Sequence, residues 1–444
     1  MREQIYWNPK TELMKREDLE SLQFRKFSKM VNWSYENSPL WRRKLDDAGF
    51  KPGDIRSLED VEKIPFLTRK ELSQSQHKKP LFGDIMSIPK ELALRYHQTS
   101  GTSGSGPLRI LDGWKDWEWG SEMWCYGMYA FGVRDNDICL VASGYGNFIG
   151  FWLAHYACER IGALTIPTGG MSSEDRINKI MEMDITVLVS TPTYAIRLAQ
   201  VASGMGINLA KDSKIKFLLH AGEPGASIPG TKKMLEEVWG AKVGDFPGMS
   251  ETGGSTCFEC AEQSGGLHIL EDHYIQEVID PKTTENLGHG QRGELVLTSF
   301  GRGALPLIRY RTGDLVERVD SSFCSCGRTF DLYKGGILGR ADDMKHVKGV
   351  NIFPSAVEDI IREFKEINEF QIVIYTENDL DQIKVKIEPV AEFSSDRYQE
   401  LQKAIAEKLY NAHRLSFRVE IVEPDTLPKF ELKSKRLQDL REKK

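Results

Sequence analysis

Apolar side chains in the N-terminal part of the chain recur at the spacing of helices. Within residues 1–90 the clearest run consists of Leu19, Leu22, Phe24, Phe27, Met30, Val31 and Trp33. Such positions share one face of a helix with 3.6 residues per turn. The sequence Asn37-Ser38-Pro39 then predicts a break, because proline lacks a backbone donor and favours turns. We therefore predict a mostly helical N-terminal segment.

Between Arg95 and Ser250, short β-rich runs alternate with helical stretches. The predicted strands are Asp137–Ser143, Thr186–Ser190 and Lys216–His220. The predicted helices are Phe151–Ile161, Ser173–Met183 and Thr231–Trp239. Alternation of this kind predicts an α/β fold whose sheet is flanked by helices and binds ligands near its strand ends.

The pattern changes again toward the C-terminus. Residues 255–335 are strand-like and glycine-rich, and Gly335, Gly336 and Gly339 then indicate a flexible joint. The elements predicted after it are a helix, a hairpin, a helix and a strand, at Pro354–Phe364, Phe370–Tyr375 with Gln382–Ile387, Asp396–Tyr410 and Phe417–Val422. We predict a large, multi-layer α/β domain over 1–338 and a small, mobile α+β domain over 339–444.

Composition and charge narrow the class of protein. The 444 residues suggest more than one domain. Lysine and arginine number 59 against 65 acidic residues, and this balance argues against a nucleic-acid binder. No stretch approaches the roughly 18 apolar residues of a membrane span, and no secretory signal is visible. Seven cysteines, an odd number, argue against a disulfide scaffold, so we expect a cytoplasmic protein.

A loop rich in hydroxyls and glycines separates two strand-like runs. It reads Thr99-Ser100-Gly101-Thr102-Ser103-Gly104-Ser105-Gly106-Pro107. Glycines allow close approach of the backbone to an anion, and free N–H groups form an anion-binding concavity. The loop is not a Walker loop, because no GK[ST] follows. The residues alone leave a phosphate site and a flexible surface turn as alternatives.

Four further segments carry candidate chemistry, although each is weak singly. Glu251, within 245–254, follows a strand end and offers the hard oxygen ligand that magnesium prefers. Asp314 ends the segment 309–314, and its carboxylate can accept two ribose hydroxyls. The other two segments are 339–354 and 427–436. The plain alternatives are exposed acids at turns and, for Lys433, a solvated lysine.

Taken together and in this order, the five segments resemble the signature set of the adenylate-forming superfamily of acyl-CoA ligases, adenylation domains and luciferases. Further details resemble its phenylacetate–coenzyme A ligase branch. They are Gly144-Tyr145-Gly146, Gly222-Glu223-Pro224, Gly266–Ile269, Glu271-Asp272-His273, Leu305–Arg311, Cys324–Thr329 and Gly349–Pro354. The resemblance covers nearly the whole chain, as far as Leu440.

The resemblance implies a nucleotide site. The implied cradle for the ATP phosphates is Thr99, Ser100, Gly101, Thr102, Ser103 and Gly104. The implied border of the nucleotide is Gly222, Glu223, Pro224, Asp245, Phe246, Pro247, Gly248, Met249 and Ser250. Glu251 would bind magnesium, Asp314 the ribose, and Arg340 the ribose or α-phosphate side.

The resemblance also implies a moving part. Asp342 matches the hinge, and Lys433 matches the lysine brought to the reacting carboxylate and α-phosphate, where metal and lysine neutralise charge. Three features depart from the family pattern. Pro107-Leu108 follows the loop, Pro247 replaces an aromatic residue that stacks on adenine, and Leu432 replaces a glycine. None removes a charge that the first step needs.

The cysteines of the segment 255–335 indicate a metal site. Cys257, Cys260, His268, Cys324 and Cys326 give five candidate ligands for one four-coordinate ion, and zinc suits thiolates with an imidazole. Some relatives in this branch carry such a site. We favour a structural zinc on Cys260, His268, Cys324 and Cys326, with Cys257 as the spare. Unligated buried thiols are the alternative.

The segment after residue 143 predicts an acid pocket by its resemblance to the family. Tyr145 and Phe148 could stack on an aromatic ring, Gly146 leaves room, and His220 could bond a substituent. Core packing is the alternative for Phe148, and a structural role for His220. The predicted substrate is an aryl or arylacetic acid.

The sequence thus predicts an enzyme that activates an aromatic carboxylic acid with ATP and Mg²⁺ and transfers the acyl group to coenzyme A. A carrier-protein thiol or an amine is an alternative acceptor, and a non-catalytic nucleotide-binding protein is an alternative of another class. No nucleic-acid or membrane partner is expected. A homodimer is left open.

Overall fold

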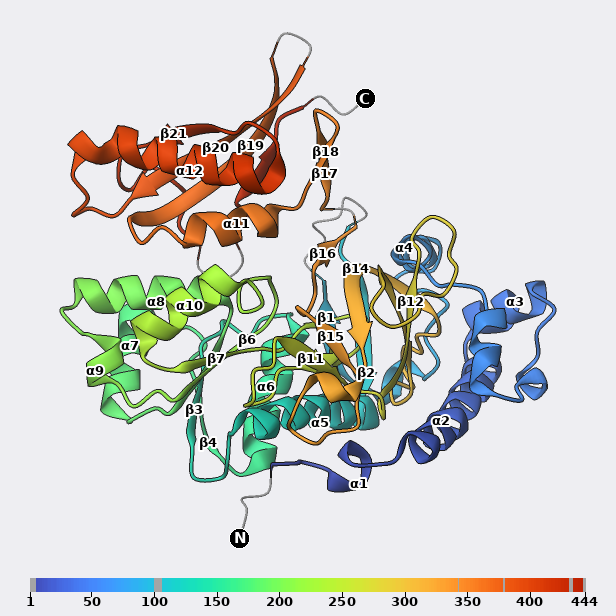
Figure 1. Cartoon of the computed structure of the whole chain (residues 1–444). Helices are drawn as coiled ribbons and strands as arrows, with labels where there is room; N and C mark the ends of the chain where they lie inside the picture. Colours follow the sequence, from blue (N-terminus) through green and yellow to red (C-terminus); the bar gives the residue numbers. More distant parts are fainter. Residues whose placement is uncertain (1–4, 100–105, 342, 378–379, 431–433, 442–444) are drawn as a thin grey trace. The chain divides into compact units, whose positions relative to one another are not determined.

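The computed structural model describes residues 5–99, 106–341, 343–377, 380–430 and 434–441 (Figure 1). The chain forms two compact units. The first comprises Met1–Ser190, Lys214–Gly222 and Gly244–Leu338. The second comprises Thr191–Ser213, Glu223–Val243 and Gly339–Lys444. The second unit therefore adds two segments from the middle of the chain to the C-terminal part, and the division into 1–338 and 339–444 stays a prediction.

The N-terminal segment is helical, as predicted. Its helices are α1 (Pro9–Glu12), α2 (Arg16–Asn37), α3 (Pro39–Asp47) and α4 (Arg69–Lys78), with 3-10 turns at Pro52–Asp54, Leu58–Lys63 and Lys90–Leu92. The predicted break is confirmed at Ser38, whose side chain caps α3 by accepting from the backbone N–H of Trp41 at 3.4 Å. Phe27, Val31 and Trp41 are fully buried and pack in one cluster with Leu307.

A parallel sheet forms the core of the middle of the chain. Its strands, in order, are β4 (Leu164–Pro167), β3 (Ile138–Val141), β5 (Val187–Ser190), β6 (Phe217–His220) and β7 (Lys242–Asp245). The intervening helices are α5 (Trp114–Phe131), α6 (Ile149–Ile161), α7 (Ser173–Glu182), α8 (Pro192–Gly204), α9 (Leu209–Asp212) and α10 (Pro229–Trp239). All three predicted strands and all three predicted helices of this region are confirmed, as is the α/β class.

Antiparallel strands make up most of the rest of the first unit. A second sheet has the order β10 (Cys257–Phe258), β11 (Gly266–Ile269), β15 (Leu332–Lys334), β14 (Tyr310–Val319), β13 (Arg292–Ser299) and β12 (Tyr274–Ile279). Two short pairs join β1 (Ala93–Gln98) to β2 (Arg109–Gly113), and β8 (Gly248–Met249) to β9 (Gly254–Ser255). A 3-10 turn lies at Ser321–Phe323.

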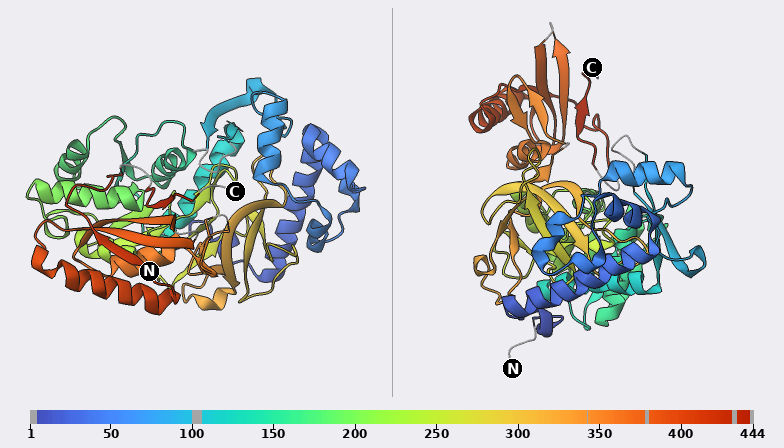
Figure 2. Two further views of the ribbon diagram at one scale, coloured as in Figure 1. Left: turned by 90° about the horizontal axis from the view of Figure 1, so that it is seen from above. Right: turned by 90° about the vertical axis from the view of Figure 1, so that its right-hand side faces the viewer.

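The second unit is an α+β structure with its own apolar core. Its sheet has the order β21 (Arg418–Ile421), β20 (Leu380–Pro389), β19 (Ile367–Glu377) and β22 (Leu437–Asp439). The other C-terminal elements are β16 (Gly339–Arg340), β17 (Lys345–Val347), β18 (Val350–Ile352), α11 (Pro354–Arg362), a 3-10 turn at Ser395–Arg397 and α12 (Tyr398–His413). Apolar residues of α11 and α12 pack on the sheet in one buried cluster. Figure 2 shows α12 lying along one face of this sheet.

The predicted order of helix, hairpin, helix and strand is confirmed in this unit. The middle segments join it through α10, because the backbone N–H of Gly230 donates to Asp359 of α11 at 2.8 Å. Lys365 and Glu237 add an ion pair at 2.8 Å. Within the described ranges, no helix combines the length and the apolar character needed to cross a membrane.

Candidate active site

The ends of neighbouring strands bring predicted site residues to one edge of the parallel sheet. His220 ends β6 and Asp245 ends β7. The backbone N–H of Phe246 donates to the carbonyl of His220 at 2.9 Å, so these two ends lie side by side. Tyr145 follows β3, and β5 is the one strand that lies between β3 and β6 in the sheet. Open α/β sheets bind ligands at this edge, beyond the carboxyl ends of their strands.

Glu251 lies in the turn between β8 and β9. A Cβ at Gly248 would collide with the carbonyl of Gly254, so the close approach of the two strands requires glycine. Arg302 fixes the backbone of the turn, because its NH1 donates to the carbonyls of Ser250 and Glu251, both at 2.7 Å. The turn therefore holds Glu251 at a defined position.

Arg302 is itself held by a buried carboxylate. Its Nε donates to Oδ1 of Asp112 at 2.7 Å, and its NH2 donates to Oδ2 at 2.8 Å. Both side chains are withdrawn from solvent, with exposed fractions of 0% and 2%. Burial raises the pKa of Asp112, against the lowering effect of Arg302. A two-point bond of this kind fixes the guanidinium plane and, through it, the Glu251 turn.

The carboxylate of Glu251 is ion-paired with Arg69. Glu251 is 7% exposed, so its negative charge requires a cationic partner in the folded protein. The guanidinium of Arg69 supplies this positive charge. Carboxylate oxygens are also ligands that Mg²⁺ prefers, so a magnesium ion could neutralise Glu251 in the same way. The donor set therefore fits the magnesium role expected of Glu251.

The predicted phosphate loop is described only at its two ends. Thr99 and Leu108 bond to each other, by Thr99 N to Leu108 O at 3.0 Å and Leu108 N to Thr99 Oγ1 at 2.9 Å. Arg69 also reaches these ends, because its NH2 donates to Thr99 Oγ1 at 3.0 Å and to the carbonyl of Gly106 at 3.3 Å. The predicted ligands Ser100, Gly101, Thr102, Ser103 and Gly104 lie outside the described residues.

Asp314 lies in β14 at an irregularity of the ladder, directly after Gly313, whose φ is +78°. Its backbone N–H donates to Thr312 Oγ1 at 3.0 Å, and its side chain is half-buried. The thiol of Cys257 has a pKa raised by burial and, further, by the negative charges of Asp245 and Asp314. The charges of Asp245 and Asp314 thus both act on the buried thiol of Cys257.

The predicted nucleotide border includes side chains of different kinds. The ring of Phe246 is fully buried and stacks on Trp124, with ring centroids 5.6 Å apart, so only its backbone is available to a nucleotide. Pro247, Met249 and Ser250 are half-buried, and Gly248 is exposed.

Glu223 belongs to the second unit and binds two segments of it. Its Oε1 accepts from the backbone N–H of Thr193 at 3.0 Å, at the start of α8. Its Oε2 accepts from the backbone N–H of Ser434 at 2.8 Å and from the Ser434 hydroxyl at 3.2 Å. The neighbouring Gly222 and Pro224 are exposed.

The other predicted site residues of the second unit are described only in part. Arg340 lies in β16 and is half-buried. The predicted hinge Asp342 and the predicted catalytic Lys433 lie outside the described residues, as does Leu432. Ser434 directly follows Lys433 in the sequence and is the nearest described residue to it along the chain.

The residues predicted to line the acid pocket differ in their packing. Tyr145 turns its hydroxyl to Nδ1 of His155, at 3.0 Å, and its ring contacts Trp152, with centroids 4.7 Å apart. Phe148 is exposed, and a Cβ at Gly146 would meet no atom within 4 Å. Open space therefore adjoins Gly146, whereas Tyr145 packs against α6.

His220 is fully buried, and its two ring nitrogens differ in their surroundings. Its Nδ1 lies 3.1 Å from the carbonyl of Ser190, which can only accept, so Nδ1 carries the proton. Burial lowers the pKa of His220 to about 4, so the ring is neutral near pH 7. Its Nε2 is then an acceptor, and it has no partner within the described part of the chain. A donor on a bound acid would satisfy it.

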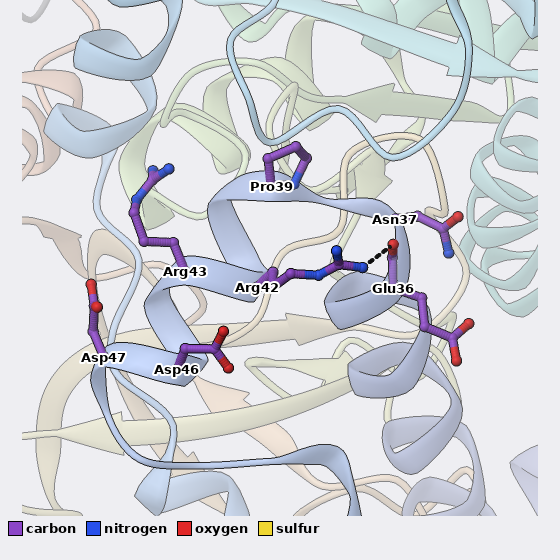
Figure 3. A pocket seen from close by; sticks show the side chains of 7 residues that line it. All are labelled: Glu36, Asn37, Pro39, Arg42, Arg43, Asp46 and Asp47. Atoms are coloured by element: carbon purple, nitrogen blue, oxygen red, sulfur yellow. Dashed lines mark hydrogen bonds between the residues drawn. The ribbon is translucent and has the colours of Figure 1, made fainter.

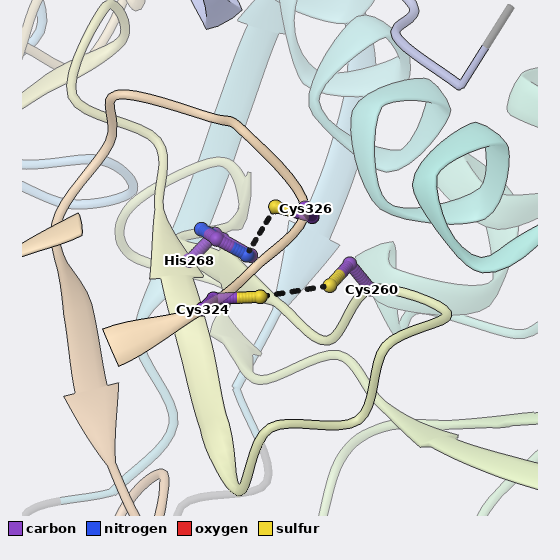
Figure 4. A group of neighbouring side chains, drawn as sticks. All are labelled: Cys260, His268, Cys324 and Cys326. Atoms are coloured by element: carbon purple, nitrogen blue, oxygen red, sulfur yellow. Dashed lines mark hydrogen bonds between the residues drawn. The ribbon is translucent and has the colours of Figure 1, made fainter. Parts of the chain in front are cut away.

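Four of the five candidate metal ligands come together (Figure 4). The ligand atoms of Cys260, His268, Cys324 and Cys326 lie within 4.8 Å of one another, and all four residues are buried. Sγ of Cys260 lies 3.6 Å from Sγ of Cys324, and Sγ of Cys326 lies 3.3 Å from Nε2 of His268. Zn–S bonds of about 2.3 Å in a tetrahedron imply S···S separations of roughly 3.8 Å, so the donor set fits zinc. Cys257 is buried outside this group.

A hollow of about 440 Å³ lies on α2 and α3 (Figure 3). Its lining includes Arg42 and Arg43. Arg42 donates to the carbonyl of Glu36 at 2.7 Å, and Arg43 pairs with Asp84 at 3.0 Å. Both cations are already bound, and we assign the hollow no part in the candidate site.

Sequence reasoning missed Arg69, Asp112 and Arg302. Arg69 lies 182 residues from Glu251 in the chain, and Asp112 lies 190 residues from Arg302. No periodicity or motif links such distant positions. The one local signal was the sequence Thr68-Arg69-Lys70-Glu71, in which threonine and glutamate form a capping box that starts α4 at Arg69.

The sequence is similar to curated enzymes over almost its whole length. Residues 349–441 match the model of the AMP-binding enzyme C-terminal domain. The phenylacetate–coenzyme A ligase of Thermus thermophilus is 32% identical over 455 residues, with 98% of this chain and 100% of that protein covered. The phenylacetate–coenzyme A ligase of Escherichia coli is 31% identical, with 96% and 95% covered.

The fold is similar to that of solved 2-hydroxyisobutyryl-CoA ligase structures. The complex with 2-HIB-AMP in the postadenylation state has a TM-score of 0.93 at 29% identity, with 99% of this chain and 93% of that chain covered. The complex with 2-HIB-AMP and CoA in the thioesterification state has a TM-score of 0.74 at 30% identity, with 100% and 94% covered. The relatives compared by sequence and those compared by structure are all named as ligases of an acid with coenzyme A.

Proposed function

Because the chain belongs to the phenylacetate–coenzyme A ligase family of adenylate-forming enzymes, we propose that its active site joins a carboxylic acid to coenzyme A using ATP. The reaction has two halves. ATP and the acid first form an acyl-adenylate with release of pyrophosphate, and coenzyme A then takes the acyl group with release of AMP. The full-length match to curated ligases is the observation that carries this conclusion. It also favours coenzyme A over a carrier protein or an amine as acceptor.

The first half needs groups that neutralise charge and hold ATP. A carboxylate oxygen of the acid attacks the α-phosphorus, and the bond to pyrophosphate breaks. Bound magnesium would supply positive charge to the phosphates, held by Glu251. The chain itself contributes the phosphate loop that begins at Thr99, and Asp314 for the ribose hydroxyls. Positioning and neutralisation of charge account for most catalysis in such transfers.

The second half needs a different arrangement around the carbonyl carbon. The thiolate of coenzyme A attacks this carbon, and AMP leaves with the oxygen that bridged carbon and phosphorus. We propose that rotation at Asp342 exchanges the two arrangements and that Lys433 serves the first half only. The hydrogen bond that the backbone N–H of Ser434 donates to Glu223 supports the role of Lys433, because it anchors the residue that follows Lys433.

The proposed substrate is an aryl or arylacetic acid. The curated relatives act on phenylacetate by name, whereas the structural relative is named for 2-hydroxyisobutyrate. Gly146 adjoins open space, and the exposed ring of Phe148 could stack on an aromatic acid. Nε2 of His220, which has no partner among the described residues, offers an acceptor to a hydroxyl or amino substituent of the acid.

The proposed role of the cysteine cluster is a structural zinc site. Four protein ligands leave no open position for a substrate, as in structural rather than catalytic sites. Sγ of Cys260 and Sγ of Cys324 lie 3.6 Å apart, close enough for both thiolates to bind one zinc ion. The four ligands come from β11 and the loops beside it, so the ion would clip these loops together.

Exchange of labelled pyrophosphate into ATP tests the first half-reaction. The assay uses magnesium and a panel of benzoic, phenylacetic, 4-hydroxyphenylacetic, indoleacetic, 2-hydroxyisobutyric and acetic acids. We expect exchange with an aromatic acid and little with acetate. Exchange confined to aliphatic acids would overturn the aromatic class alone, and no exchange with any acid would count against the ligase reaction itself.

A further inference from the structure

A single guanidinium connects three predicted parts of the nucleotide site. Arg69 pairs with the carboxylate of Glu251, the predicted magnesium ligand. Its NH2 donates to Thr99 Oγ1 at 3.0 Å and to the carbonyl of Gly106 at 3.3 Å. Thr99 and Gly106 stand at the two ends of the phosphate loop. The side chain of Arg69 is 21% exposed, so solvent reaches it only in part.

The fold positions Arg69 by two independent anchors. The capping box places it at the first residue of α4, with Glu71 Oε2 accepting from Thr68 N at 2.8 Å. Just before it, Leu67 pairs with β14, by Leu67 N to the carbonyl of Arg309 and Arg311 N to the carbonyl of Leu67, both at 2.9 Å. The start of α4 is thereby fixed against the sheet that carries Asp314.

The position of Glu251 does not depend on Arg69. The backbone of the Glu251 turn is held by Arg302, which is fully buried. The side chain of Arg69 can therefore leave the carboxylate without loss of the turn. An arginine has a long side chain and a fork of donors suited to phosphate oxygens as well as to carboxylates.

We propose that Arg69 exchanges partners when ATP binds. Without nucleotide, Arg69 neutralises Glu251 and holds the loop ends together. When the triphosphate and its metal enter, Glu251 passes to the metal and the guanidinium turns to the phosphate oxygens. This inference rests on the proposed function and adds to it a residue that competes with the metal and then assists the phosphates.

Two binding measurements separate this role from a merely structural one. Arg69→Gln removes the charge. The nucleotide-free variant should bind Mn²⁺ about tenfold more tightly than the wild type, because Glu251 loses its competing cation. The same variant should bind ATP in EDTA about tenfold more weakly, because a phosphate contact is lost. A structural defect would weaken both affinities, so the opposite signs are diagnostic.

Matched variants complete the test. Lys70 is the next residue of α4 and is exposed, so Lys70→Gln should leave both affinities within about twofold of wild type. Arg69→Lys keeps a cation and should keep Mn²⁺ binding weak. Mn²⁺ is followed by electron paramagnetic resonance, ATP by calorimetry, and folding by circular dichroism.

The outcomes are distinct. Opposite shifts in Arg69→Gln support the exchange. Unchanged Mn²⁺ affinity, or parallel loss of both affinities, overturns it while leaving the ligase proposal intact. A wild-type protein that binds no ATP, with or without metal, overturns the proposed function and this inference together.

Discussion

Glu223 accepts two hydrogen bonds from Ser434, one from its backbone N–H at 2.8 Å and one from its hydroxyl at 3.2 Å. The second oxygen of the same carboxylate accepts from Thr193 at the start of α8. The carboxylate thus ties the residue that follows Lys433 to a helix elsewhere in the second unit. If Lys433 acts in the first half-reaction, weakening these hydrogen bonds should lower the rate of adenylation.

Glu223→Gln should slow adenylation more than thioester formation. The amide keeps the size of the side chain but removes the charge that strengthens these bonds, a loss of about 1.4 kcal/mol or about tenfold in rate. Pyrophosphate exchange measures the first half, and thiolysis of preformed acyl-adenylate measures the second. Ser434→Ala, which keeps the backbone bond, is the control and should stay within about threefold. Equal losses in both halves would refute the assignment.

Arg302→Met should destabilise the first unit strongly. It leaves Asp112 as a buried charge without a partner, so the free energy of unfolding should fall by roughly 3–5 kcal/mol. The matched control is Arg292→Met, because Arg292 pairs with Glu317 at 2.9 Å but is 74% exposed. That change should cost less than about 1 kcal/mol. Urea denaturation measures the free energy of unfolding of both variants from the first unfolding transition. Similar losses in the two variants would contradict a buried ion pair between Arg302 and Asp112.

His220 should make the protein less stable in acid. Burial lowers its pKa to about 4, below the ordinary 6.5, so the unfolded chain binds its proton more readily. The stabilising contribution of the neutral His220 ring is fully present above pH 6.5, its pKa in the unfolded chain. This contribution is lost as the pH falls from 6.5 toward 4. Between pH 7 and pH 5 the loss amounts to about 2 kcal/mol.

His220→Gln removes that contribution. The variant should lose about 2 kcal/mol less than the wild type over the same pH interval, whatever its absolute stability. His346→Gln, at an exposed histidine, should follow the wild type. Urea titrations at both pH values give the difference, and a parallel pH dependence of His220→Gln and wild type would exclude a buried neutral His220.

The cysteine cluster should hold one zinc ion. Cys324→Ser should lose the metal and lower the melting temperature, since a metal a thousandfold above its Kd stabilises a fold by about 4 kcal/mol. Adenylation below the melting range should persist, because a structural metal site takes no part in turnover. Cys257→Ser alters a buried thiol outside the cluster and should retain the metal. Elemental analysis decides, and a metal-free wild type would rule the site out.

The sequence predicted those features that repeat along the chain. Buried parallel strands are short apolar runs, so Thr186–Ser190 and Lys216–His220 predicted β5 and β6 to within a residue. The helical pattern predicted α7 to within one residue and α11 to within two. The sequence also predicted the grouping of Cys260, His268, Cys324 and Cys326, because three thiolates and an imidazole in one segment suit a tetrahedral zinc ion.

What could not be predicted depends on contacts between distant positions. Arg69 with Glu251 and Arg302 with Asp112 leave no trace in local spacing. The burial of the Phe246 ring against Trp124 is likewise set by packing between α5 and the end of β7. The grouping of α8 and α10 with the C-terminal part also follows from long-range packing.

The central claim is that the acid passes through an acyl-adenylate on its way to coenzyme A, and transfer of a carboxylate oxygen tests it most directly. Phenylacetate, or whichever acid supports exchange, is labelled with ¹⁸O in its carboxylate and converted with ATP and coenzyme A. The account predicts one ¹⁸O in each AMP and none in pyrophosphate, because the bridging oxygen leaves with AMP. Unlabelled AMP, or label in orthophosphate with formation of ADP, would contradict it.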